Sequence, residues 1–137
     1  QEHLCLLLGY QEEYILAASN SAFKFYRSYE IPKKNGGFRR ISEPLPSLKE
    51  IQRWILDNIL ESIEVSPYAK AYIKKKSIKE NAKFHKGQEI VLSLDMKNFF
   101  DSITSDKVYN CFKELGYKKD VVVLLTNLCC ANGCLPQ

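Results

Sequence analysis

The sequence predicts an α/β fold in the broad sense that helices are combined with short strands (α+β), and three observations carry this prediction. Apolar residues recur at steps of three and four over residues 47–64, which is typical of a helix with one face on a core. Asn35-Gly36 stands between two short extended arms, as in a β-hairpin. Residues 90–95 form a short apolar run of the kind found in a buried strand.

The composition is that of a folded domain. The chain has 137 residues, of which 45% are hydrophobic and 12% aromatic. This is enough to bury a core without the help of disulfide bonds or structural metal ions. No apolar run approaches the ~20 residues of a membrane span, so no membrane association is expected. The five cysteines are odd in number, and the spacing of Cys129, Cys130 and Cys134 matches no standard zinc pattern. We therefore expect buried thiols in a reducing, cytoplasmic compartment.

The other elements follow from turn and capping residues. Residues 3–19 predict two short helices that meet at Gly9. The hairpin covers residues 29–41, and the helix over 47–64 ends before Ser66-Pro67. A further short helix is predicted over residues 77–85, with polar side chains on one face.

The last third of the chain alternates a strand, a turn and helices. After the 90–95 strand we expect a turn through residues 99–101, and then a helix capped by Thr104 or Ser105 that Gly116 ends. Residues 121–130 are strongly apolar and favour a helix, although three consecutive valines leave a strand possible.

Asp95 is the most informative single residue, because it ends the apolar run. A carboxylate among hydrocarbon neighbours is costly unless a partner such as a divalent cation offsets its charge. The alternative is an ordinary helix-capping aspartate. Asp95 is thus a candidate metal ligand at the edge of a sheet.

Basic residues are concentrated in two segments, although the net charge is only +4. One segment brackets the glycine turn of the predicted hairpin, and the other lies between Val65 and Gly87, where a single acid occurs. Such clusters are most often solvated faces, but with aromatic residues among them they indicate a polyanion partner. The lysines of the second segment are Lys70, Lys74, Lys75, Lys76, Lys79, Lys83 and Lys86.

Five ordered blocks carry a resemblance to a known family. They are IPKKNGGFRRISEP, LKEIQRWIL, SIKENAKFH, VLSLDMKNFFDSI and NGCLPQ. In this order they resemble bacterial reverse transcriptases of the retron type, with group II intron enzymes as more distant relatives. The resemblance implies part of a right-hand polymerase fold, with residues 1–28 as a helical lead-in, 29–88 as fingers and 89–137 as a partial palm.

The resemblance also implies roles for residues of the palm. Asp95 corresponds to the first catalytic aspartate, which bridges two Mg²⁺ ions, and the backbone carbonyl of Met96 would be a further ligand. Phe100 corresponds to the aromatic residue under the incoming sugar, where its bulk excludes a 2′-hydroxyl. Because neighbours in an extended stretch point to opposite sides, we expect Phe99 in the core. Gln137 corresponds to a glutamine that contacts template and nucleotide.

The implied fingers residues bind phosphates and nucleic acid. Lys33 and Arg39 correspond to the residues that hold the nucleotide triphosphate, which suits a lysine point charge and an arginine fork. The second basic segment and the polar face of its short helix are candidates for contacts with nucleic acid. These candidates are Lys74, Lys75, Lys76, Lys79, Asn81 and His85.

The function implied is RNA-directed DNA polymerisation by two-metal nucleotidyl transfer, with an RNA template, dNTPs and Mg²⁺. Such enzymes commonly act in antiviral defence in the bacterial cytoplasm, and an accessory protein is possible. The alternatives are a non-catalytic RNA-binding module on the same scaffold, or a template-independent polymerase of a defence system. The Tyr-x-Asp-Asp segment of the family is missing, and Asp101 and Asp106 are too close in sequence to Asp95 to be obvious substitutes. We therefore expect a truncated chain that is inactive alone.

Overall fold

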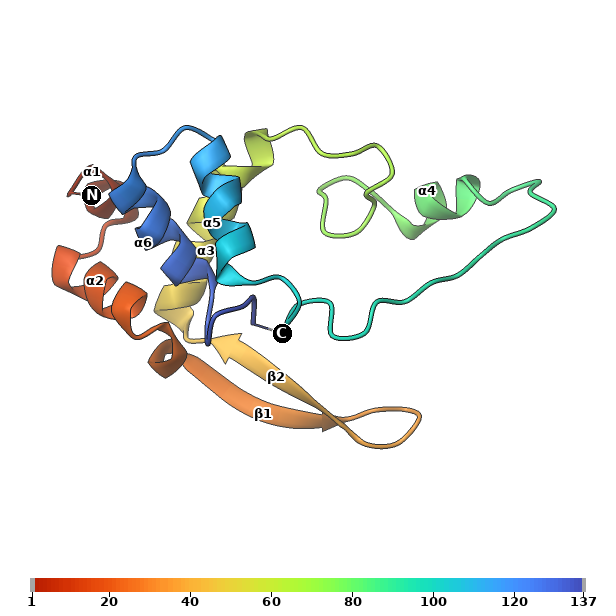
Figure 1. Ribbon diagram of the computed structural model, residues 1–137, viewed down its shortest axis with the longest axis horizontal. Helices are drawn as coiled ribbons and strands as arrows, with labels where there is room; N and C mark the ends of the chain where they lie inside the picture. The colour runs from red at the N-terminus through yellow and green to blue at the C-terminus, as the bar shows by residue number, and fades with distance from the viewer. Residues whose placement is uncertain (1, 137) are drawn as a thin grey trace.

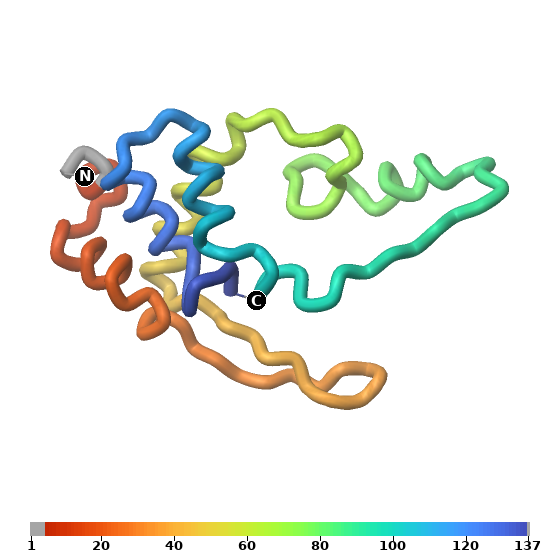
Figure 2. Tube along the Cα trace, viewed as in Figure 1, coloured from red at the N-terminus to blue at the C-terminus, as the bar shows by residue number. Residues whose placement is uncertain are grey.

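The computed structural model describes residues 2–136 and has three visible parts (Figure 1). A helical body is joined to a projecting hairpin, and a long excursion leaves the body after residue 62 and returns to it before residue 105 (Figure 2). The mixture of helices with one small sheet confirms the predicted α/β class. The body contains α1 (Glu2–Leu8), α2 (Glu12–Asn20), α3 (Pro46–Asn58), α5 (Ser105–Glu114) and α6 (Lys119–Cys129).

The core lies where α6 meets α2, α3 and α5. Ile51 and Ile55 are one turn apart on α3, so both face inward, and both are fully buried with Leu125 of α6. Burying each such side chain stabilises the fold by roughly 1.5–3 kcal/mol. Residues 121–129 are helical rather than extended, because α6 can bury Val122 and Leu125 against these neighbours.

The long predicted helix is shorter than expected. Pro46 occupies the first turn of α3, where its missing N–H costs nothing, and α3 ends at Asn58. The chain then tightens into a 3₁₀ turn, η2 (Leu60–Ser62), in which the Ser62 hydroxyl donates to the Ile59 carbonyl at 2.8 Å. The predicted helix end near residue 64 is therefore wrong, because the α-helix ends at Asn58.

The predicted hairpin is confirmed. Strands β1 (Tyr26–Pro32) and β2 (Phe38–Pro44) are antiparallel, and Ile31 lies opposite Arg39. The amide of Lys33 donates to the Gly37 carbonyl at 2.9 Å and closes the loop. The left-handed φ angles belong to Gly36 (+87°) and Gly37 (+79°) rather than to Asn35, so the turn is longer than a two-residue one.

The predicted strand over residues 90–95 is wrong. These residues have no regular structure, and Ile90, Leu92 and Leu94 are 87%, 75% and 83% exposed. A strand needs a partner for its backbone groups, and within residues 2–136 the sheet contains β1 and β2 alone. Asp95 therefore follows an exposed extended segment instead of a buried strand.

The predicted short helix on the excursion is confirmed as α4 (Ile78–Lys83). Ser77 and Glu80 form a capping box at its start, in which each side chain accepts from the other residue's amide at 3.3 Å. None of the side chains of α4 is buried.

No helix in the described part of the chain is both long and apolar enough to cross a bilayer.

Candidate active site

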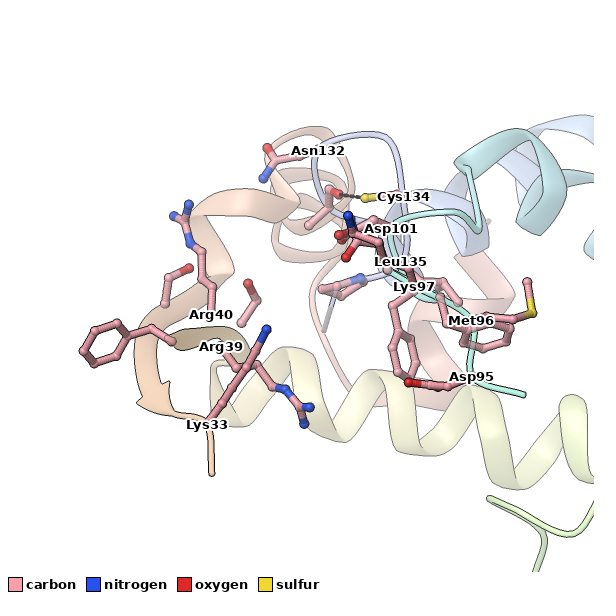
Figure 3. A pocket seen from close by; sticks show the side chains of 18 residues that line it. Lys33, Arg39, Arg40, Asp95, Met96, Lys97, Asp101, Asn132, Cys134 and Leu135 are labelled. Carbon is pink, nitrogen blue, oxygen red and sulfur yellow. Dashed lines mark hydrogen bonds between the residues drawn. The ribbon is translucent and has the colours of Figure 1, made fainter. Parts of the chain in front are cut away.

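An open cavity of about 710 Å³ lies between the hairpin and the chain that returns to the body (Figure 3). Three segments that are distant in sequence line it: the hairpin, residues 95–101 and residues 131–136. Five of the predicted site residues line this one cavity. They are Lys33, Arg39, Asp95, Met96 and Phe100.

The hairpin supplies the positive side of the cavity. Lys33 follows β1, and Arg39 and Arg40 follow one another on β2, so the short loop brings three cations together. All three are exposed, and none of them forms an ion pair within the described part of the chain. Their charge is therefore available to an anion that enters the cavity.

The opposite side is a turn that follows Asp95. Asn98 adopts a left-handed φ of +52°, and its carbonyl accepts from the Ser102 amide at 3.0 Å. The Ser102 hydroxyl also donates to the Phe99 carbonyl, at 2.7 Å. These bonds hold the turn that carries Asp101, and Asp95 and Asp101 both line the cavity. Figure 3 shows Asp95 across the cavity from Lys33 and Arg39.

The predicted placement of Phe99 in the core is wrong. Phe99 is 46% exposed and lines the cavity together with Phe100. The two rings meet edge to face, with centroids 5.6 Å apart. The prediction assumed an extended backbone, in which neighbours point to opposite sides, whereas residues 97–102 form a turn.

The C-terminal segment closes the third side. The amide of Ala131 donates to the Cys134 carbonyl at 2.9 Å, and the amide of Leu135 donates to the Ile103 carbonyl at 3.0 Å. The second bond ties this segment to the chain just after Asp101. Gln137 lies outside the described residues, so its predicted contact with template and nucleotide stays a prediction.

The predicted nucleic-acid contacts do not line the cavity. They lie on the excursion, where Lys74 forms ion pairs with two carboxylates. Its Nζ atom lies 2.6 Å from Glu61 and 3.0 Å from Asp57, and these hydrogen bonds raise the pKa of Lys74, that to Glu61 most. All six candidates stay predictions: Lys74, Lys75, Lys76, Lys79, Asn81 and His85.

Sequence reasoning overlooked several residues of the cavity. Arg40, Lys97 and Asn132 also line it, and so does Asp101, which was set aside because it is close to Asp95 in sequence. The signal for Arg40 was its position next to Arg39 in the basic turn. The turn of residues 97–102 has no comparable local signature, so the position of Asp101 depends on the folded structure.

The donor atoms of the cavity suit a hard cation only in part. Carboxylate and carbonyl oxygens are the ligands that Mg²⁺ takes in proteins, and residues 95–101 offer both kinds. Among residues 2–136 there is no group of three or more His, Cys, Asp or Glu side chains placed to hold a metal ion. The described residues thus supply an incomplete oxygen set, to which further ligands would have to be added.

Comparison with known proteins assigns the family. The family model described as reverse transcriptase (RNA-dependent DNA polymerase) matches residues 31–134, which include the loop and second strand of the hairpin, the excursion and most of the residues that line the cavity. This chain belongs to the reverse transcriptase family. The resemblance seen in the five sequence blocks is confirmed.

Curated relatives of this reverse transcriptase chain are retron enzymes. It is 39% identical over 114 residues to the retron Ec86 reverse transcriptase of Escherichia coli, an alignment that covers 82% of this chain and 36% of that protein. The retron Mx162 reverse transcriptase of Myxococcus xanthus is 37% identical over 103 residues, covering 75% and 21%. The retron Mx65 enzyme of the same species is 33% identical over 121 residues, covering 88% and 28%. The chain thus spans roughly a third of these relatives or less.

Proposed function

We propose that the full-length protein that carries this chain is a retron-type RNA-directed DNA polymerase, and that the cavity between hairpin and turn holds the incoming dNTP. The observation that carries this proposal is that three cations of the hairpin, which form no ion pair within residues 2–136, share one cavity with a turn that bears a carboxylate. A nucleoside triphosphate has the complementary chemistry, because its phosphates are anionic and its sugar is compact and apolar on one face.

Each side of the cavity has a distinct task in this proposal. Lys33 and Arg39 neutralise and orient the triphosphate, since phosphoryl transfer depends on positioning and charge stabilisation more than on covalent participation. Phe100 lies under the sugar, where its ring leaves no room for a 2′-hydroxyl. The result is selection of deoxyribonucleotides.

Asp95 is proposed as a ligand for Mg²⁺, together with the backbone carbonyl of Met96. Bound metal ions would polarise phosphoryl oxygens and stabilise the charge that develops in the transition state. Two ions need more ligands than residues 95–101 supply, so the two-metal site is proposed for the full-length protein.

The biological setting is proposed on the resemblance to retron enzymes. The partner is an RNA template, with a cognate structured noncoding RNA as the candidate, and the place of action is the bacterial cytoplasm. Antiviral defence, with an accessory protein, is the proposed role.

Primer extension on an RNA template tests the triphosphate assignment in the full-length enzyme. Replacing Lys33 and Arg39 together by glutamine should raise KM for dNTP and lower kcat/KM by about 10-fold to 100-fold for each hydrogen bond removed, because a hydrogen bond to a charged group contributes roughly 1.5–3 kcal/mol. Arg27→Gln is the matched control, since Arg27 is an exposed arginine of β1 that does not line the cavity.

Equal kinetics of the double variant and Arg27→Gln would refute the assignment. An unsubstituted full-length protein that binds RNA but extends no primer would support the RNA-binding module instead.

A further inference from the structure

Within residues 2–136, the ion pairs between the loop of residues 66–76 and the body are made by one side chain. Lys74 reaches two carboxylates at the end of α3 and in η2, with Nζ 3.0 Å from Asp57 Oδ1 and 2.6 Å from Glu61 Oε1. In the described part of the chain, the other hydrogen bonds of this loop remain within it, such as Ala69 to Ser66 and Lys76 to Ile73. Lys74 is therefore the polar link between loop and body.

The backbone around Lys74 is in an unfavourable conformation. Tyr72 and Lys75 have left-handed φ angles of +61° and +64°, a region that side chains with a Cβ atom rarely occupy. Such conformations persist where surrounding interactions hold them. Lys74 lies between these two positions, so its two ion pairs act together with the Lys76–Ile73 hydrogen bond at this turn.

The same loop places an aromatic ring on the candidate sugar gate. Tyr72 meets Phe100 edge to face, with centroids 6.4 Å apart and an interplanar angle of 79°. Phe99 meets the Phe100 ring in the same way, at 5.6 Å and 78°. Phe100 thus contacts two rings, although Tyr72 itself is 91% exposed. The Tyr72 ring is therefore outside the core, and in the described part of the chain the ring that it meets is Phe100.

We propose that Tyr72 and Lys74 are positioning residues for sugar selection: Lys74 anchors the loop on Asp57 and Glu61, and the anchored Tyr72 restricts the ring of Phe100. The inference rests on the proposed function, in which Phe100 excludes the 2′-hydroxyl. Steric exclusion requires a ring that cannot swing aside, because a rotamer change would open the space that a ribose needs. An edge-to-face neighbour removes part of that freedom.

The proposal gives Lys74 a different role from the predicted nucleic-acid contact. The charge of Lys74 is already balanced by two carboxylates, so Lys74 should attract a phosphate less strongly than its neighbours Lys75 and Lys76 do. Its substitution should therefore change sugar choice more than the affinity for RNA.

The test compares kcat/KM for a ribonucleotide and the matching deoxyribonucleotide in the full-length enzyme. Tyr72→Ala and Lys74→Gln should each raise the ribo-to-deoxyribo ratio several-fold, and Lys74→Arg, which can keep both ion pairs, should restore the original ratio. Lys49→Gln is the matched control, because the side chain of Lys49 is 63% exposed and that of Lys74 is 60% exposed. Lys49 also forms an ion pair, with its Nζ atom 3.5 Å from Glu43, but this pair lies outside the loop. The ratio of Lys49→Gln should not change.

Phe100→Ala in the same assay distinguishes the sugar-gate role of Phe100 from the positioning role of Tyr72 and Lys74. If Phe100→Ala raises the ratio and Tyr72→Ala and Lys74→Gln do not, the positioning role is refuted and the sugar gate stands. If Phe100→Ala itself leaves the ratio unchanged, the gate fails and the positioning role fails with it.

A measurement without catalysis tests the anchor. Chymotrypsin cleavage after Tyr72, identified by mass spectrometry, should be several-fold faster in Lys74→Gln than in the unsubstituted protein, because the released loop fits a protease more readily. Lys49→Gln and Lys74→Arg should be cleaved at the original rate. An unchanged rate in Lys74→Gln would overturn the anchor even if the full-length protein made no DNA.

Discussion

At the scale of single residues, the charged side chains of the loop and of the cavity differ in whether they form ion pairs. Ion pairs in the described part of the chain join Lys49 to Glu43 and Lys74 to Asp57 and Glu61, whereas the cations at the cavity have no such partner. A surface ion pair typically contributes at most about 1 kcal/mol to stability. The Lys74 ion pairs therefore matter less for the stability of the protein than for the position of the loop of residues 66–76.

Thiol reactivity gives a prediction at this scale. Burial raises the pKa of the Cys130 thiol to about 11, so at pH 8 almost none of it is the reactive thiolate, whereas Cys111 is exposed. Iodoacetamide at pH 8 should therefore label Cys111 well before Cys130, and labelling of Cys130 should accelerate as the pH rises toward its pKa. Peptide mass spectrometry measures both rates, with unfolded protein as the control. Equal native rates would show that Cys130 is not buried.

At the scale of elements, features with a local sequence signal were predictable, and pairing between distant segments was not. The four-residue steps of α3 and the Asn35-Gly36 turn of the hairpin are local signals, and both correspond to elements in the structure. The 90–95 strand failed because pairing is not local: an apolar run becomes a strand only beside another strand, and the described chain places none there. Phe99 was misplaced because residues 97–102 form a turn and not the extended backbone that the prediction assumed.

The capping box of α4 supports a prediction about local stability. Ser77→Ala removes the side chain that accepts from the Glu80 amide, which costs about 0.5–2 kcal/mol. Because no residue of α4 is buried, the loss should appear as local unfolding, with faster amide exchange at Asn81 and Ala82 and an unchanged Tm. Hydrogen exchange by NMR measures this. Ser93→Ala, at an exposed serine outside any helix, is the control, and an equal effect of both substitutions would argue against the box.

At the scale of the whole molecule, the structure joins three distant segments around one cavity. The family resemblance placed Lys33, Arg39, Asp95 and Phe100 in one site, and the cavity brings all four together. Composition and periodicity alone could not have done so, because they carry no information about which segments meet. The division into lead-in, fingers and partial palm stays a prediction, although the core includes Ile15, Ile55 and Leu125 from all three segments.

The excursion supports a prediction about RNA binding by the full-length protein. Lys75, Lys76 and Lys79 are exposed and have no ion pair within residues 2–136, so their charges are free to meet phosphates. Replacing all three by glutamine should reduce the slope of log affinity against log salt by roughly 0.7 to 0.9 for each phosphate that the variant no longer neutralises. Fluorescence anisotropy at several salt concentrations measures the slope. Lys49→Gln should leave it unchanged, and an unchanged slope in the triple variant would assign these lysines to an ordinary solvated face.

The most direct measurement of the central claim is primer extension by the full-length enzyme with Asp95→Asn, on an RNA template with Mg²⁺ and dNTPs. The substitution removes a charge proposed to hold metal at the reacting phosphate, which should cost several kcal/mol in the transition state and therefore orders of magnitude in rate. Asp106→Asn is the matched control, because Asp106 is an exposed aspartate of α5 that does not line the cavity. We predict that Asp95→Asn abolishes DNA synthesis with an unchanged Tm while Asp106→Asn remains active. Extension by Asp95→Asn at the unsubstituted rate would contradict the account.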